Sequence, residues 1–70
     1  MIGINERLRK ARLSANLTQE AVAEKVGVSR QTMSNWENGK SNPDISSVIA
    51  LSDVYKISLD ALLKGEAAKA

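Results

Sequence analysis

The sequence on either side of Gly27 predicts two short helices joined by a tight turn. Thr18 precedes the first helix, where its hydroxyl can accept a hydrogen bond from a free amide of the first turn. Gly27 readily adopts the left-handed conformation that ends a helix, and Ser29 follows in a position to cap the next one. We therefore expect one helix over Gln19–Val26 and a second from Ser29 to about Glu37.

The second of these helices is predicted to be amphipathic. At about 100° per residue, Met33 and Trp36 fall on one side of it. Its polar residues fall on the other side, with one arginine at the flank: Gln31, Ser34, Asn35 and Asn38, and Arg30. Arginine, glutamine and asparagine can make paired hydrogen bonds to base edges in the DNA major groove. The pattern favours DNA recognition, and the alternatives are an ordinary solvated face and, for the arginine, contact with phosphate alone.

Three further helices are predicted outside this pair, and no strand-like alternation competes with them. Their expected ranges are Ile4–Ser14, Ile45–Tyr55 and Leu59–Lys64. Asp44 and Ser58 are placed to cap the last two, and Gly65 to close the last. The stripe expected to face inward in the 45–55 helix is Ile45, Val48, Leu51, Ser52 and Tyr55. The chain is therefore predicted to be all-α, with one domain over residues 1–65 and a frayed tail at 66–70.

The composition limits the chemistry open to this chain. Its 70 residues make one small domain, and an apolar content of 43% is enough for a compact core. The absence of cysteine and histidine excludes thiolate and imidazole zinc sites, and also Ser-His-Asp and Cys-His catalytic systems. The eight acidic residues are scattered along the chain. We therefore expect no enzymatic activity, no catalytic residues, no metal and no cofactor.

The distribution of charge is uneven. The net charge is only +2, but residues 1–40 hold seven basic and four acidic side chains, whereas residues 41–70 hold three and four. The basic excess therefore lies in the half that contains the predicted reading helix. The sequence shows no secretory signal and no long apolar run. We therefore expect the protein in the cytoplasm, associated with the nucleoid. We expect no membrane partner and no small-molecule ligand.

Residues 6–65 resemble a known family at several specific motifs. Gln-x-x-x-Ala-x-x-x-Gly at 19–27 is followed nine residues later by Trp-Glu-Asn-Gly at 36–39, and Ile-Ser-Leu-Asp stands at 57–60. This pattern is similar to that of the phage-repressor-like (Cro-like, Xre-like) helix-turn-helix family. The resemblance implies a lambda-repressor-like bundle of five helices, with its helix-turn-helix motif at about residues 18–38. It also implies that the third helix enters the major groove and that a homodimer binds a near-palindromic operator in double-stranded DNA.

The resemblance also implies roles for individual residues. Those that match base-reading positions are Arg30, Gln31 and Asn35, with Ser34 as a lesser candidate. Those that match phosphate-binding positions are Gln19, Ser29, Asn38 and Lys40. Arg12 and Glu37 match a structural ion pair between helices, with a direct role at the DNA as the alternative. The family often has an acidic residue where Ala21 stands, and a glycine where Lys56 stands. The turn before the fifth helix is therefore expected to need a left-handed non-glycine residue.

Several other residues allow more than one interpretation. Trp36 is interpreted as a core residue, because base stacking is a mode of single-strand binding. A solvated face is preferred to a phosphate contact for the basic residues of the first helix: Arg7, Arg9 and Lys10. In the fifth helix, Leu59 and Leu63 are one turn apart, could form an exposed strip, and match a common dimer contact of the family.

These observations predict a sequence-specific regulator of transcription that binds double-stranded DNA, acting as a repressor by occluding a promoter. The alternative is a protein-interaction adaptor, or an antitoxin, that uses the same bundle. The polar residues on the outer face of the third helix favour DNA binding, because an adaptor would be expected to show apolar residues there.

Overall fold

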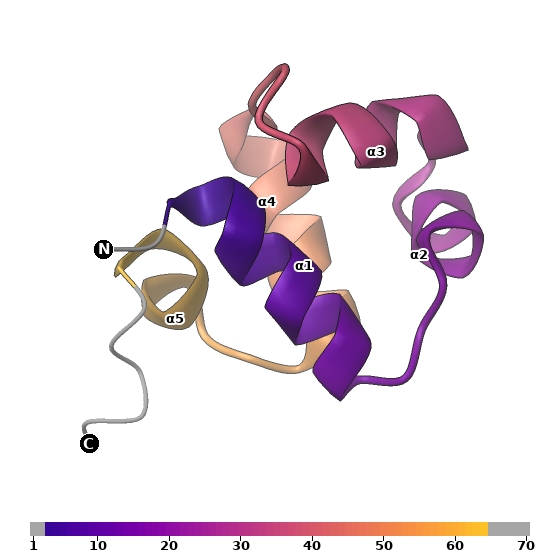
Figure 1. The fold of residues 1–70 in the computed structure, drawn as a ribbon. Helices are drawn as coiled ribbons and strands as arrows, with labels where there is room; N and C mark the ends of the chain where they lie inside the picture. Colours follow the sequence, from indigo (N-terminus) through magenta and orange to yellow (C-terminus); the bar gives the residue numbers. More distant parts are fainter. Residues whose placement is uncertain (1–2, 65–70) are drawn as a thin grey trace.

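A computed structural model describes residues 3–64, which form five α-helices and no strands (Figure 1). The helices are α1 (Ile4–Ser14), α2 (Gln19–Val26), α3 (Arg30–Glu37), α4 (Ile45–Tyr55) and α5 (Leu59–Lys64). These bounds confirm the predicted ranges and the all-α fold. The predicted tail at 66–70 and the closing Gly65 lie outside the described residues.

The predicted caps hold the starts of four helices. The hydroxyl of Thr18 accepts a hydrogen bond from the amide of Ala21 at 3.0 Å. This cap forms although Ala21 stands where the resembled family often has an acidic residue. Ser29 caps α3 at 3.0 Å and Ser58 caps α5 at 3.1 Å. Asp44 caps α4, and hydrogen bonds from Ser47 and Ser46 lower the pKa of its carboxyl group below the ordinary value. Each cap gives a hydrogen-bond acceptor to an amide that has no partner within the helix.

A residue in the left-handed conformation follows each of four helices. Gly27 has φ 88° after α2, and Gly39 has φ 77° just beyond α3. Lys56 follows α4 at φ 59°, as expected for a position where the family commonly has glycine. Asn16 adopts φ 60° after α1, a conformation that asparagine tolerates better than most residues.

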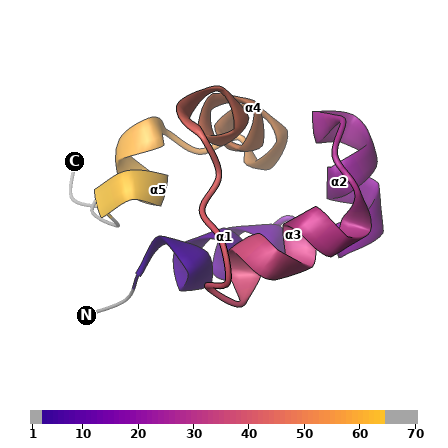
Figure 2. The ribbon, with the colours of Figure 1, turned by 90° about the horizontal axis from the view of Figure 1, so that it is seen from above.

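The helices surround one apolar core. α2 packs against α3 and α4, α1 packs against α3 and α5, and α5 also packs against α4. Figures 1 and 2 together show α2 and α5 on opposite sides of the bundle, with α4 between them. The buried hydrophobic side chains are Leu8, Val22, Ala23, Met33, Trp36, Val48, Leu51, Tyr55 and Leu62. Because one core contacts all five helices, the surface of α3 is held on a rigid base.

Two predictions about side chains of α4 and α1 are wrong. Ile45 is 64% exposed instead of facing inward. It begins α4 at the edge of the buried stripe, on the side that carries the exposed Ile49, and none of the described helices covers it. Arg7 does not lie on a solvated face, because its guanidinium donates to the carbonyl oxygens of Leu62 and Leu63. These carbonyls belong to the last turn of α5, where the helix dipole also favours a cation.

Within the described residues, no helix has the length and apolarity needed to cross a membrane. The same part of the chain contains no cluster of three or more potential metal-ligating side chains.

Candidate nucleic-acid interface

Helix α3 presents a polar surface on an apolar anchor. Met33 is completely buried and Trp36 is 6% exposed, so both fix the helix to the core. On the outer side, Arg30 and Gln31 are exposed, and Asn35 is half-buried at the edge of the same surface. Backbone positions along the helix are thus set by packing, while the amide and guanidinium groups remain accessible. An arrangement of this kind can present hydrogen-bonding groups to base edges in a major groove.

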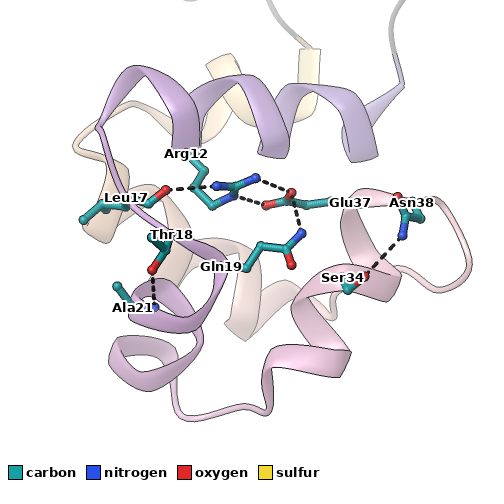
Figure 3. Close-up of polar contacts among 8 residues, drawn as sticks. All are labelled: Arg12, Leu17, Thr18, Gln19, Ala21, Ser34, Glu37 and Asn38. Carbon is teal, nitrogen blue, oxygen red and sulfur yellow. Dashed lines mark hydrogen bonds and ion pairs between the residues drawn. The ribbon is translucent and has the colours of Figure 1, made fainter.

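The polar side chains of α3 also bind each other. Nε2 of Gln31 donates to Oδ1 of Asn35 at 3.1 Å. One turn further along, Nδ2 of Asn38 donates to Oγ of Ser34 at 3.2 Å (Figure 3). Both pairs join residues four apart, which face each other on a helix. Helical periodicity predicts that these residues share one face, but it does not predict that they are paired.

A bidentate ion pair attaches α1 to the end of α3 (Figure 3). Nε of Arg12 lies 2.8 Å from Oε2 of Glu37, and Nη2 lies 3.0 Å from Oε1. The side chain of Glu37 is 1% exposed and that of Arg12 is 12% exposed. The hydrogen bond from Arg12 to the carboxylate raises the pKa of the guanidinium, more than burial lowers it. Nη1 of Arg12 also donates to the carbonyl of Leu17 at 2.9 Å, so the pair fixes the segment before α2 as well.

Gln19 joins the same carboxylate from a third helix. It is the first residue of α2, and its Nε2 donates to Oε1 of Glu37 at 3.1 Å (Figure 3). The side chain is half-buried and still has an amide oxygen and a second N–H. The predicted contact of Gln19 with phosphate therefore stays a prediction, and the structure adds a role in orienting α2 against α3.

Tyr55 extends this buried polar region without taking part in its hydrogen bonds. Its hydroxyl oxygen is buried and has no partner among the described residues. Burial raises the pKa of this hydroxyl, and the negative charge of Glu37 raises it further, while Arg12 lowers it. Helical spacing predicts Tyr55 in the core but carries no signal that its hydroxyl would lack a partner among the described residues.

The remaining predicted site residues lie at the ends of α3 and on α5. Ser29 is exposed before α3, and Asn38 and Lys40 are exposed after it. On α5, Leu63 is 42% exposed, whereas Leu59 is half-buried and packs against the core. The two leucines do not form a uniformly exposed strip, and their role in a dimer stays a prediction.

Comparison with known proteins agrees with this geometry. A family model described as "Helix-turn-helix" matches residues 8–62. The chain belongs to this helix-turn-helix family. It is 44% identical to the HTH-type transcriptional activator BcrR of Enterococcus faecalis over 62 residues, which is 89% of this chain and 30% of that protein. It is 36% identical to the HTH-type transcriptional regulator ImmR of Bacillus subtilis over 97% of this chain and 54% of that protein.

Solved structures support the same assignment over almost the whole domain. The crystal structure of the c2 repressor of phage P22 in complex with a synthetic operator superimposes with a TM-score of 0.86 at 35% identity. The match covers 93% of this helix-turn-helix chain and 98% of that one. By contrast, this chain spans only 30% and 54% of the two curated relatives above. The likeness therefore concerns the helix-turn-helix domain that they share.

Proposed function

We propose that this chain binds specific sites in double-stranded DNA and regulates transcription, acting as a repressor. The observation that carries the proposal is the accessible polar surface of α3, fixed from behind by Met33, Trp36 and the buried Glu37 carboxylate. A rigid base matters because base recognition requires donors and acceptors to be held in register with the groove. The operator complex of a structurally similar repressor supports this mode of binding.

In this proposal, base contacts and phosphate contacts come from different residues. The base-reading residues are Arg30, Gln31, Ser34 and Asn35, and the phosphate-binding residues are Gln19, Ser29, Asn38 and Lys40. Contacts with phosphate set the position of the protein and depend on salt, whereas contacts with base edges provide discrimination. The phosphate-binding residues lie before and after α3 and at the start of α2, so they can hold the helix from both ends.

The functional unit in this proposal is a homodimer on a near-palindromic operator. Two-fold symmetry in the protein then matches two-fold symmetry in the DNA, with half-sites about one helical turn apart. Leu59 and Leu63 on α5 are the proposed dimer contacts. The protein acts in the cytoplasm without a cofactor or enzymatic activity, and represses by occupying a promoter.

The central experiment is selection of bound fragments from random duplex DNA at moderate salt, followed by a promoter–reporter assay on the selected site. We expect a two-fold symmetric consensus and reduced transcription in the presence of the protein. A selected pool without sequence preference would contradict specific recognition. Increased transcription from the selected site would contradict repression and make the chain an activator, as the name of the Enterococcus relative describes that protein.

Substitution of Gln31 tests the base-reading role directly. We expect Gln31→Ala to weaken operator binding by about 1–3 kcal/mol and to relax base preference at one position. The measurement is fluorescence anisotropy on the selected operator and on variants of each base pair. Full affinity with an unchanged preference would remove Gln31 from the readout.

Lys40→Ala is the matched test of a phosphate contact. Because a phosphate contact is independent of sequence, this variant should weaken binding to specific and random duplexes by the same factor. It should also reduce the slope of log K against log salt concentration by about 1. A loss confined to the operator would make Lys40 a base-reading residue instead.

A further inference from the structure

The hydrogen bond between Gln31 and Asn35 joins two side chains that are proposed to read bases. Nε2 of Gln31 donates and Oδ1 of Asn35 accepts, at 3.1 Å, across one turn of α3. Gln31 is exposed and Asn35 half-buried, so their remaining polar atoms stay accessible. The two amides therefore present a joint set of donors and acceptors, and each constrains what the other can bind.

The hydrogen bond uses up one group on each side chain. A glutamine amide has two N–H donors and one carbonyl oxygen, and so does an asparagine amide. After the bond forms, Gln31 offers one N–H and its Oε1. Asn35 offers both N–H groups of Nδ2, while its oxygen is already engaged. Gln31 is left with one donor and one acceptor, and Asn35 acts mainly as a donor.

For Gln31, this favours adenine over guanine. Adenine presents N7 as an acceptor and N6–H as a donor in the major groove, which matches one N–H and one carbonyl oxygen. Guanine presents two acceptors, N7 and O6, so it would need both N–H groups of a single amide. Because Asn35 engages one of these N–H groups, the paired Gln31 cannot give both to guanine.

For Asn35, the same bond favours a base pair that presents acceptors. Its two free N–H groups match N7 and O6 of guanine or O4 of thymine. The bonded atoms of the two side chains are 3.1 Å apart, and successive base pairs are stacked about 3.4 Å apart. The two amides can therefore meet neighbouring base pairs without breaking the bond between them.

We propose that Gln31 and Asn35 read two adjacent base pairs as one unit, with adenine at Gln31 and guanine or thymine at Asn35. The inference rests on the proposed function, because it requires α3 to enter the major groove. It makes Asn35 a positioning residue for the base choice of Gln31, in addition to its own contact.

The test compares consensus sequences selected from random duplex DNA by four proteins: wild type, Gln31→Ala, Asn35→Ala and Asn35→Asp. Gln31→Ala identifies the operator position that Gln31 reads, as the position where preference disappears. At that position the wild type should prefer adenine over guanine by about tenfold, a typical size for one well-formed base contact. Asn35→Ala releases the second N–H of Gln31, so adenine and guanine should become nearly equal there. Circular dichroism checks that each variant remains folded.

Asn35→Asp is the matched control, because a carboxylate oxygen still accepts the N–H of Gln31. We expect it to keep the preference for adenine at the Gln31 position. At its own position, preference should move toward cytosine, whose N4 amino group donates to a carboxylate. The comparison uses relative base frequencies within each selected pool. A general loss of affinity caused by the added negative charge therefore does not affect the result.

The outcomes separate this inference from the proposed function. A wild-type pool without any consensus contradicts both. A clear consensus in which Asn35→Ala leaves the adenine preference of Gln31 intact contradicts the inference alone. A consensus with a base other than adenine at the Gln31 position also contradicts it alone. Relaxation in Asn35→Ala together with retention in Asn35→Asp supports the paired readout.

Discussion

Neighbouring residues of α3 have opposite roles because the helical period turns them to opposite sides. Met33 and Trp36 enter the core, whereas Gln31 and Asn35 remain accessible and bind each other. Tyr55 combines a favourable and an unfavourable contribution to stability in one side chain. Its ring contributes to the core, but its buried hydroxyl has no hydrogen-bond partner among the described residues. A buried hydroxyl without a partner loses its hydration without compensation.

Tyr55→Phe is therefore expected to stabilise the protein. The substitution keeps the ring and removes the unpaired polar group, so the free energy of unfolding should rise by about 1 kcal/mol. Urea denaturation of both proteins at neutral pH measures the change. A loss of stability of that size would show that the hydroxyl makes a hydrogen bond in solution.

The pH dependence of this difference gives an independent check. Burial raises the pKa of Tyr55 above its ordinary value of 10.0, so the unfolded chain ionises at lower pH than the folded one. Below pH 10.0 the hydroxyl is neutral in both states, and its ionisation does not affect the free energy of unfolding. Above that pH the unfolded chain ionises first, and the free energy of unfolding falls as the pH rises. The Phe variant lacks this loss, and its advantage over the wild type should widen in alkaline solution.

At the scale of a helix, the residues at the two ends determine where the helix starts and stops. Asp44 and Ser58 cap α4 and α5, and the left-handed residue after α4 sets the direction of the chain into α5. That residue is Lys56, at φ 59° and ψ 42°. A side chain with a Cβ is less stable than glycine in this conformation, and the strain is local to the turn.

Lys56→Gly should relieve this strain. The left-handed conformation costs a non-glycine residue about 1–2 kcal/mol, and the greater freedom of glycine in the unfolded chain offsets part of the gain. We expect a net increase of about 0.5 kcal/mol in the free energy of unfolding, measured by thermal or urea denaturation. Lys56→Ala is the control, since it also removes the charge but keeps the Cβ. Equal effects of the two variants would assign the change to charge and not to backbone strain.

At the scale of the whole molecule, two arginines of α1 connect elements that are distant in sequence. Arg12 binds Glu37 at the end of α3, and Arg7 binds the carbonyl oxygens at the end of α5. Gln19 adds α2 to the first of these connections. The position of α3, and with it the proposed reading surface, therefore depends on contacts from both α1 and α2.

Arg12→Met should destabilise the fold by about 3 kcal/mol, because it leaves the buried carboxylate of Glu37 without its cation. The double variant Arg12→Met/Glu37→Leu removes both charges and should recover most of that loss. Urea denaturation of the two variants measures the difference. An Arg12→Met protein as stable as the wild type would mean that the pair contributes little to folding. Binding defects in the single variant need to be corrected for the unfolded fraction.

Local patterns in the sequence were sufficient for the helices and for their caps. The spacing of apolar residues, the capping hydroxyls and Gly27 predicted all five helices, because these signals act within one or two turns of chain. The separation of Met33 and Trp36 from the polar face of α3 followed from the same periodicity.

Only the tertiary structure decided how the side chains meet. Which helix covers each position determines the exposure of Ile45 and the binding of Arg7 to α5. It also determines that the hydroxyl of Tyr55 has no partner within the described part of the chain. Helical periodicity brings Gln31 and Asn35 to the same face, but the rotamers that join their amides depend on the surroundings of α3. Periodicity specifies the direction of a side chain from its own helix, whereas its partners are set by the packing of segments far apart in the sequence.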